Sequence, residues 1–157
     1  MVVPAPIRYI LDTNIIVHYI RGGDLASRLE AAYGLSTLPL TPIVSVVSEG
    51  EIRSLAAQFN WGPEKLRKLN TQIARLVVVQ LDLTGLTDAY AQIDNYSRSL
   101  GGREMGQNDM WIAATAHVSG AHLLTTDKDF DHLDPSFQSP SARAYLTRDW
   151  VEPSTRN

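Results

Sequence analysis

Short apolar runs alternate with longer amphipathic stretches along the chain, and this alternation predicts strands and helices in turn. The strand-like runs are rich in β-branched and aliphatic residues and are bounded by turn-forming residues. Strands separated by helices are typical of an α/β domain built on a mainly parallel sheet. The predicted strands are Tyr9–Leu11, Ile43–Val46, Leu76–Leu81, His122–Thr125 and an edge strand at Arg143–Leu146.

Capping and helix-ending residues set the predicted helix limits. Ser, Thr, Asn and Asp side chains can accept a hydrogen bond from the first free N–H groups of a helix, and Gly often follows its end. The first helix is capped by Thr13 or Asn14, the third by Ser45 or Ser48, and a late one by Gln107 or Asn108. The predicted helices cover residues 14–21, 45–59, 63–75, 87–100 and 109–119. Asp24 is the predicted cap of one more helix, in which Leu25, Leu29 and Ala32 share a face.

Size and composition predict one domain over residues 1–157, with Met1–Pro6 and Glu152–Asn157 as tails. The chain has no Cys, which excludes disulfides, thiolate metal sites and cysteine nucleophiles. No apolar run approaches the ~20 residues that a membrane span needs, and the N-terminus does not have the pattern of a signal peptide. We therefore expect a cytoplasmic protein with no membrane partner.

The net charge is −3, from 14 Lys and Arg against 17 Asp and Glu. This balance excludes a protein that coats nucleic acid through a strongly basic surface. It does not exclude an enzyme whose acids are gathered at one site.

Four acids lie at the ends of predicted elements. Asp12 and Asp127 follow strands, whereas Glu51 and Asp109 lie in the first turns of helices. Ligands of open α/β sheets bind outside the carboxyl ends of the strands, so these four side chains are expected to converge there. Each acid taken singly also has an ordinary structural explanation, as a helix cap, a turn former or a solvated surface group.

A cluster of four carboxylates needs a cation, because like charges would otherwise force some of them to take up protons. Oxygen ligands without His or Cys suit Mg²⁺ or Mn²⁺. Such ions activate water and stabilise a leaving oxygen, which makes phosphodiester hydrolysis the natural chemistry.

Four motifs, in order along the chain, resemble those of PIN-domain nucleases. Tyr9–Asn14 is similar to the opening strand with its Asp-Thr-Asn signature, and Ser45–Ile52 to the second motif, in which Ser lies six positions before Glu. Asn108–Ala116 is similar to the third motif, Asn-Asp before a helix. Leu123–Phe130 is similar to the fourth, a strand followed by Thr-x-Asp and Asp-Phe.

The resemblance implies a three-layer α/β/α sandwich and a ribonuclease that depends on one or two Mg²⁺ or Mn²⁺ ions. Its metal ligands and catalytic acids would be Asp12, Asp109 and Asp127, with Glu51 bound through water or orienting the attacking hydroxide. Asp129 is a second candidate for the last ligand. Glu49 is the alternative to Glu51, but the two point about 200° apart on a helix and Glu51 has the motif's distance from Ser45.

The resemblance also implies polar partners for the acids. Basic residues near the site in sequence are candidates for contacts with RNA phosphates, although ordinary solvated surface charge is the favoured explanation for each of them. The polar partners would be Asn14, Ser45 and Thr125, and the candidate RNA contacts are Arg53, Arg103 and Lys128.

The compact size is similar to that of VapC-type toxins, which implies a cognate antitoxin that covers the site and a homodimer or antitoxin-bound hetero-oligomer. A non-toxin RNA-processing nuclease of the same family is the closest alternative. A phosphatase of the aspartyl-phosphate type is disfavoured because it needs a second Asp where Asn14 stands, and a non-catalytic binding module because all four motif acids are present.

Two further expectations concern the surface. Without the four proposed ligands, 13 acids remain against 14 basic residues, so the rest of the surface would be near +1. Trp61 begins a helical hairpin where partners could dock, and an exposed aromatic there would indicate an interface.

Overall fold

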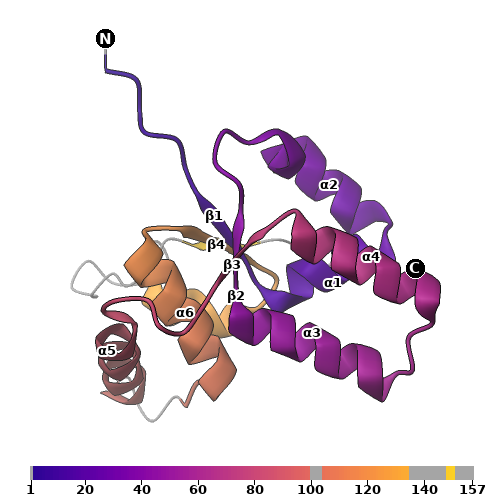
Figure 1. Cartoon of the computed structure of the whole chain (residues 1–157). Coiled ribbons are helices and arrows are strands. Elements are labelled where there is room, and N and C mark those ends of the chain that lie inside the picture. The colour runs from indigo at the N-terminus through magenta and orange to yellow at the C-terminus, as the bar shows by residue number, and fades with distance from the viewer. Residues whose placement is uncertain (1, 100–103, 135–147, 151–157) are drawn as a thin grey trace.

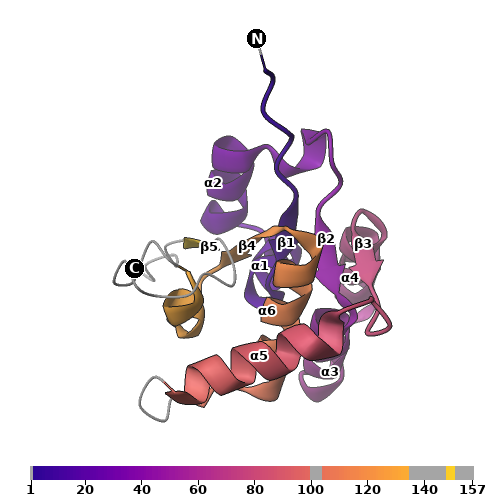
Figure 2. The same ribbon diagram turned by 90° about the vertical axis from the view of Figure 1, so that its left-hand side faces the viewer.

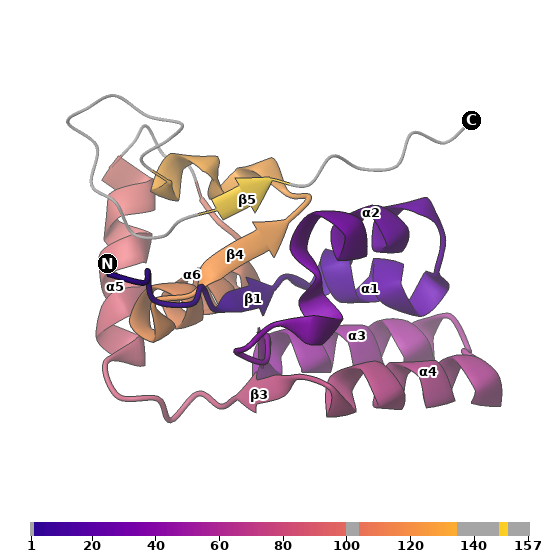
Figure 3. The ribbon, with the colours of Figure 1, turned by 90° about the horizontal axis from the view of Figure 1, so that it is seen from above.

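Five short strands form one parallel sheet in the computed structural model, which describes residues 2–99, 104–134 and 148–150. The sheet order is β3-β2-β1-β4-β5 (Figure 2), and every neighbouring pair is parallel, as Figure 3 shows for β1, β4 and β5. Ile10 of the central strand pairs with Ile43 on one side and Leu123 on the other. The strands are β1 Tyr9–Leu11, β2 Ile43–Ser45, β3 Val77–Val79, β4 His122–Thr125 and β5 Arg148–Trp150.

Helices cover both faces of the sheet, which confirms the three-layer prediction (Figure 1). On one face lie α1 Thr13–Arg21, α2 Asp24–Tyr33, α3 Val46–Gln58 and α4 Pro63–Ala74. On the other lie α5 Leu86–Ser99 and α6 Gln107–Ser119. Two 3₁₀ helices complete the fold, η1 Leu35–Thr37 and η2 Lys128–Leu133.

Successive strand residues pack into two separate cores, one on each face of the sheet, because side chains alternate across a strand. Ile10, Ile43 and Leu123 are buried against α5 and α6. Their neighbours Leu11, Val44 and Leu124 are buried against α1–α4. The sheet is therefore apolar on both faces, as parallel sheets usually are.

The predicted helix caps are right in one case and wrong in three. Gly23 stands at the capping position of α2 with no side-chain hydrogen bond, and Asp24 is already the first residue of the helix. Ser45 caps α3, with its Oγ accepting a hydrogen bond from the Val47 N–H at 3.2 Å. The cap of α1 is Asp12, whose side chain accepts from the Thr13 N–H, so neither Thr13 nor Asn14 is the cap. Helix α6 begins after Gly106 without a side-chain cap, because Asn108 lies inside the helix and its side chain bonds elsewhere.

The other differences lie at the ends of elements. The third strand is shorter than predicted, covering only Val77–Val79, since Leu81 already lies in a turn. The predicted edge strand Arg143–Leu146 and the Gly101-Gly102 end of α5 lie outside the described residues, and the edge strand β5 begins at Arg148.

Before β1 the chain runs away from the body of the domain (Figure 2). Residues 2–6, part of the predicted N-terminal tail, are exposed and form no helix or strand. The predicted C-terminal tail, residues 152–157, lies outside the described residues. Within the described part of the chain, no helix is long and apolar enough to cross a membrane.

A buried polar contact ties η2 to α5. Ser97 Oγ lies 2.8 Å from His132 Nε2, both residues are buried, and the Tyr96 ring stacks on the imidazole with centroids 6.4 Å apart. Because η2 starts directly after Asp127, this contact also fixes the segment that carries two of the motif acids.

We expect Ser97→Ala to lower the free energy of unfolding by about 1–3 kcal/mol, because it removes a buried hydrogen-bond partner of His132. Chemical denaturation measures this loss. Ser99→Ala is the matched control on the same helix; its hydroxyl is exposed, so a change within about 0.5 kcal/mol is expected. Equal losses in the two variants would contradict the role given to the Ser97–His132 contact.

Candidate active site

One cleft at the carboxyl edge of the sheet contains four of the motif acids. Because all strands are parallel, the residues that follow β1 and β4 reach the same edge, where α3 and α6 also begin. The cleft has a volume of about 720 Å³. It is lined by Asp12, Thr13, Asn14, Val47, Gly50, Glu51, Ser54, Leu55, Gln58, Asn108, Asp109 and Asp127.

Asp12 is held rigidly at the bottom of this cleft. Its side chain is only 4% exposed, and both carboxylate oxygens accept hydrogen bonds. The Thr125 hydroxyl donates to Oδ2 at 2.7 Å and the Thr13 N–H donates to Oδ1 at 2.7 Å. Burial nevertheless raises the pKa of Asp12 to about 6, and the hydrogen bonds offset only part of this rise.

Asp109, in the first turn of α6, is also kept from ionising freely. Burial raises its pKa to about 7, and the negative charges of Asp12, Asp127 and Glu51 raise it further. Gly106, just before the helix, leaves room for this carboxylate: a Cβ there would lie 3.4 Å from Asp109 Oδ2. The protein thus concentrates negative charge that a bound cation would neutralise.

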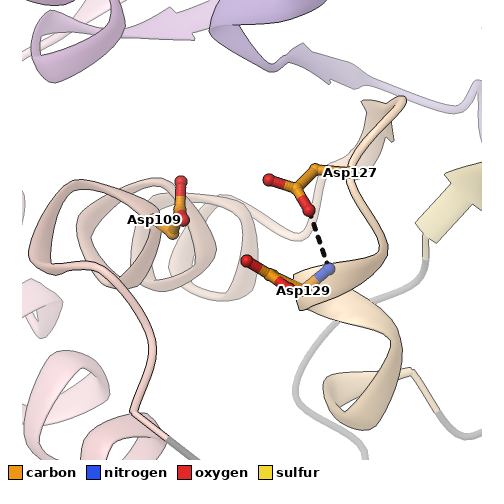
Figure 4. Close-up of side chains that lie close together, drawn as sticks. All are labelled: Asp109, Asp127 and Asp129. Atoms are coloured by element: carbon orange, nitrogen blue, oxygen red, sulfur yellow. Dashed lines mark hydrogen bonds between the residues drawn. The ribbon is translucent and has the colours of Figure 1, made fainter.

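Three carboxylates converge most closely, those of Asp109, Asp127 and Asp129 (Figure 4). One oxygen from each lies within 4.8 Å of the others. A tight turn holds two of them, since Asp127 Oδ1 accepts from the Asp129 N–H at 2.9 Å and the Asp127 N–H donates to Thr125 Oγ1 at 2.9 Å. Asp129, the second candidate in the sequence, therefore stands beside Asp109 and Asp127.

Asp12 is outside this closest group because both of its oxygens are turned toward Thr125 and the start of α1. The closest group contains only carboxylate oxygens, which are the donors that Mg²⁺ and Mn²⁺ prefer. The residues present therefore fit a hard divalent cation.

Glu51 is positioned by two residues that the sequence analysis did not include in the site. The Thr13 hydroxyl donates to Oε1 at 2.7 Å, and the Asn108 amide donates to Oε2 at 3.2 Å. Thr13 and Asn108 both lie inside the recognised motifs, each next to a motif acid. That adjacency was the available signal, but which distant side chain they reach depends on how α1, α3 and α6 pack.

The choice of Glu51 over Glu49 agrees with the geometry. Glu49 forms an ion pair with Arg53 at 2.8 Å, and Arg53 also donates to Asn70 of α4. Both side chains are thus engaged on the α4 side of α3, and neither lines the cleft.

The remaining predicted site residues have different positions. Thr125 joins two acids, and Asn14 is exposed and lines the cleft. Ser45 is fully buried as the cap of α3. Lys128 is exposed between Asp127 and Asp129, and Arg103 lies outside the described residues.

Several solved structures share this fold. The VapBC2 complex from Rickettsia felis, bound to a DNA fragment from its promoter, matches with a TM-score of 0.73 and 22% identity over 91% of this chain and 98% of that chain. VapBC-1 from nontypeable Haemophilus influenzae matches with a TM-score of 0.67 and 23% identity over 92% of this chain and 98% of that chain. VapBC-5 from Mycobacterium tuberculosis, a member of the VapBC family of toxin–antitoxin systems, matches with a TM-score of 0.64 and 22% identity over 93% of this chain and 100% of that chain.

No protein with a curated description matches the chain. The family model of the PIN domain matches residues 9–135, which include every motif acid and all of the described helices. The chain belongs to the PIN domain family.

Proposed function

We propose that this protein is a metal-dependent endoribonuclease that hydrolyses RNA phosphodiester bonds, and that it is the toxin of a toxin–antitoxin pair. The observation that carries the proposal is the convergence of Asp12, Glu51, Asp109, Asp127 and Asp129 from separate elements on one cleft. Members of the PIN domain family are nucleases, which supports hydrolysis of a nucleic acid.

The metal would be held by Asp109 and Asp127, with Asp129 and Asp12 as the neighbouring carboxylates. When bound, a Mg²⁺ or Mn²⁺ ion supplies Lewis acidity and lowers the pKa of a coordinated water. Raised pKa values at Asp12 and Asp109 support this assignment, because burial, and to a smaller extent the neighbouring negative charges, disfavour the ionised carboxylates, and a bound cation would stabilise them.

Glu51 is the residue best placed to orient the attacking water. Its two oxygens are fixed by Thr13 and Asn108, so the carboxylate has a defined direction in the cleft. The Thr125 hydroxyl bonds both the Asp12 carboxylate and the Asp127 N–H, and this fixes the position of the two acids relative to each other. The exposed amide of Asn14 is available to the sugar or phosphate of the substrate.

The antitoxin partner is supported by two observations. The matching solved structures named above are VapBC complexes, and one of them is described as a toxin–antitoxin system. A separate apolar groove of about 600 Å³ lies among α1, α2 and α4 and offers a surface for a protein segment. Leu11, Ile16, Leu35, Leu38 and Leu76 are among its lining residues.

The rest of the proposal follows from the sequence resemblance. We infer a single domain over residues 1–157 that acts in the cytoplasm and forms a homodimer or an antitoxin-bound hetero-oligomer. A non-toxin RNA-processing nuclease would use the same cleft, and growth after induced expression distinguishes the two: unaffected growth would exclude the toxin.

We expect Asp12→Asn and Asp109→Asn each to lower the rate of RNA cleavage by more than about 100-fold, because each removes a negative charge that the metal site requires. The assay follows labelled RNA with Mg²⁺ or Mn²⁺ and with chelator. Glu49→Gln is the matched control, an acid of α3 that lies off the cleft. No cleavage by the wild-type protein with either ion, or equal cleavage by Asp12→Asn, would refute the nuclease.

We expect Thr13→Val to lower the cleavage rate by about 10- to 100-fold, because Glu51 loses its 2.7 Å hydrogen bond. Thr13→Ser keeps the hydroxyl and should restore the rate. The fold is monitored by thermal unfolding, and Thr71→Val is a control at a threonine on the exposed side of α4. A Ser variant as slow as the Val variant would show that the hydroxyl is not the relevant group.

The metal-free protein should become less stable as the pH rises from about 4 to about 7. Asp12 and Asp109 have folded pKa values of about 6 and about 7, above the value of 3.8 for the free carboxyl. Between these values the folded state binds more protons than the unfolded state, so the free energy of unfolding falls with rising pH and levels off above pH 7.

Thermal unfolding across this range tests the effect, and Asp109→Asn should flatten the slope. Mn²⁺ should raise the melting temperature most above pH 7, where both carboxyls are ionised. A metal-free protein that gains stability from pH 4 to 7 would contradict the electrostatic description of the site.

A further inference from the structure

The cleft continues along α3 to the turn that joins it to α4, residues 58–63, here called the hairpin tip. Gln58, the last residue of α3, still lines the cleft. Phe59 follows directly and is 68% exposed. From Glu51 to Phe59 the helix rises about 12 Å, so the tip lies a short distance from the acids.

The turn itself leaves Phe59 in solvent. Asn60 adopts a left-handed backbone with φ of 48°, which reverses the chain. The Trp61 N–H then donates to the Ala56 carbonyl at 2.9 Å, and the indole packs against the α1–α4 core. Trp61 is thus half-buried, which weakens the case for an interface at its indole, and the exposed aromatic at this turn is Phe59.

Basic side chains surround the tip. Lys65 Nζ lies 4.0 Å from the centre of the Trp61 ring, and Arg21, Lys65 and Lys68 line a shallow groove of about 440 Å³ beside it. Glu64 lines the same groove and forms an exposed ion pair with Lys68 at 3.8 Å, which water screens.

The charge of the chain is divided accordingly. Residues 46–75 contain five basic and three acidic residues, whereas the rest of the chain contains nine basic and fourteen acidic residues. The α3–α4 hairpin thus has a net positive charge, whereas the rest of the chain has a net negative charge.

We propose that the hairpin tip binds single-stranded RNA, with an unpaired base stacked on Phe59 and phosphates beside Arg21, Lys65 and Lys68. Exposed aromatics among basic residues are the usual means of binding an unpaired strand. The proposal rests on the proposed function, since the bound strand extends from the acids along Ser54 and Gln58 to the tip. It makes an unpaired segment, rather than a duplex, the substrate.

A protein partner fits the tip less well. The larger apolar groove, of about 600 Å³, lies elsewhere, among α1, α2 and α4. A smaller groove of about 390 Å³ beside the tip is lined by Arg53, Ala56, Ala57, Asn60, Trp61, Leu66 and Leu69, whereas cationic side chains line the groove on the side of Gly62 and Pro63. Phosphate groups complement these cations, and every base offers a face for stacking.

Binding is measured by fluorescence anisotropy with an unpaired oligoribonucleotide of about 12 nucleotides and with a duplex RNA of equal length. The full chain carries Asp12→Asn and is studied without metal, so the result does not depend on cleavage. Phe59→Ala should weaken binding of the unpaired RNA about tenfold, and Phe59→Trp should retain it. The control Leu81→Ala removes an apolar side chain that is 42% exposed and lies away from the tip.

Salt dependence tests the phosphate contacts separately. Arg21→Gln and Lys68→Gln should each reduce the slope of log affinity against log salt by about 1, whereas Phe59→Ala should leave it unchanged. Unchanged affinity in Phe59→Ala, or an equal loss with duplex RNA, would overturn the proposal. Loss of self-association in Phe59→Ala, measured by light scattering without loss of RNA affinity, would make the tip a protein interface and overturn it as well.

Discussion

The burial of carboxylates held close together is the constraint on which this structure depends. Asp12 is buried, Asp109 is half-buried, and burial and neighbouring charges raise the pKa values of both. The fold tolerates this because the acids come from elements with cores of their own and are fixed by Thr125, Thr13 and the turn at η2. The ionised carboxylates lower the free energy of unfolding at this site, and a bound cation would raise it again.

The rigidity of the cleft comes from polar contacts between distant segments. Thr125 at the end of β4 reaches Asp12 at the end of β1, and Asn108 of α6 reaches Glu51 of α3. Such contacts keep each carboxylate in one orientation before any ion or substrate arrives, and preorganisation of this kind lowers the cost of binding. The α1–α4 layer and the α5–α6 layer are thus joined at the site as well as through the sheet.

The sequence was sufficient for the alternating order of elements, the parallel sheet and the convergence of acids at its carboxyl edge, since these follow from periodicity and from where Asp12 and Asp127 leave their strands. It left Asp129 as an alternative to Asp127, because whether both carboxylates reach Asp109 depends on how the turn into η2 directs them. It also missed the contacts of Thr13 and Asn108 with Glu51, which arise only when three helices pack. The predicted cap of α6 was wrong for the same reason, since the Asn108 side chain bonds Glu51 instead of the start of its own helix.

The parallel order of the strands has a consequence for how this protein is made. Asp12 and Thr125 are separated by 113 positions, and Asp127 and Asp129 follow later still. No stretch of this sequence that ends before β4 contains the complete cleft. The acids can therefore come together only after β4 and the turn into η2 have been synthesised.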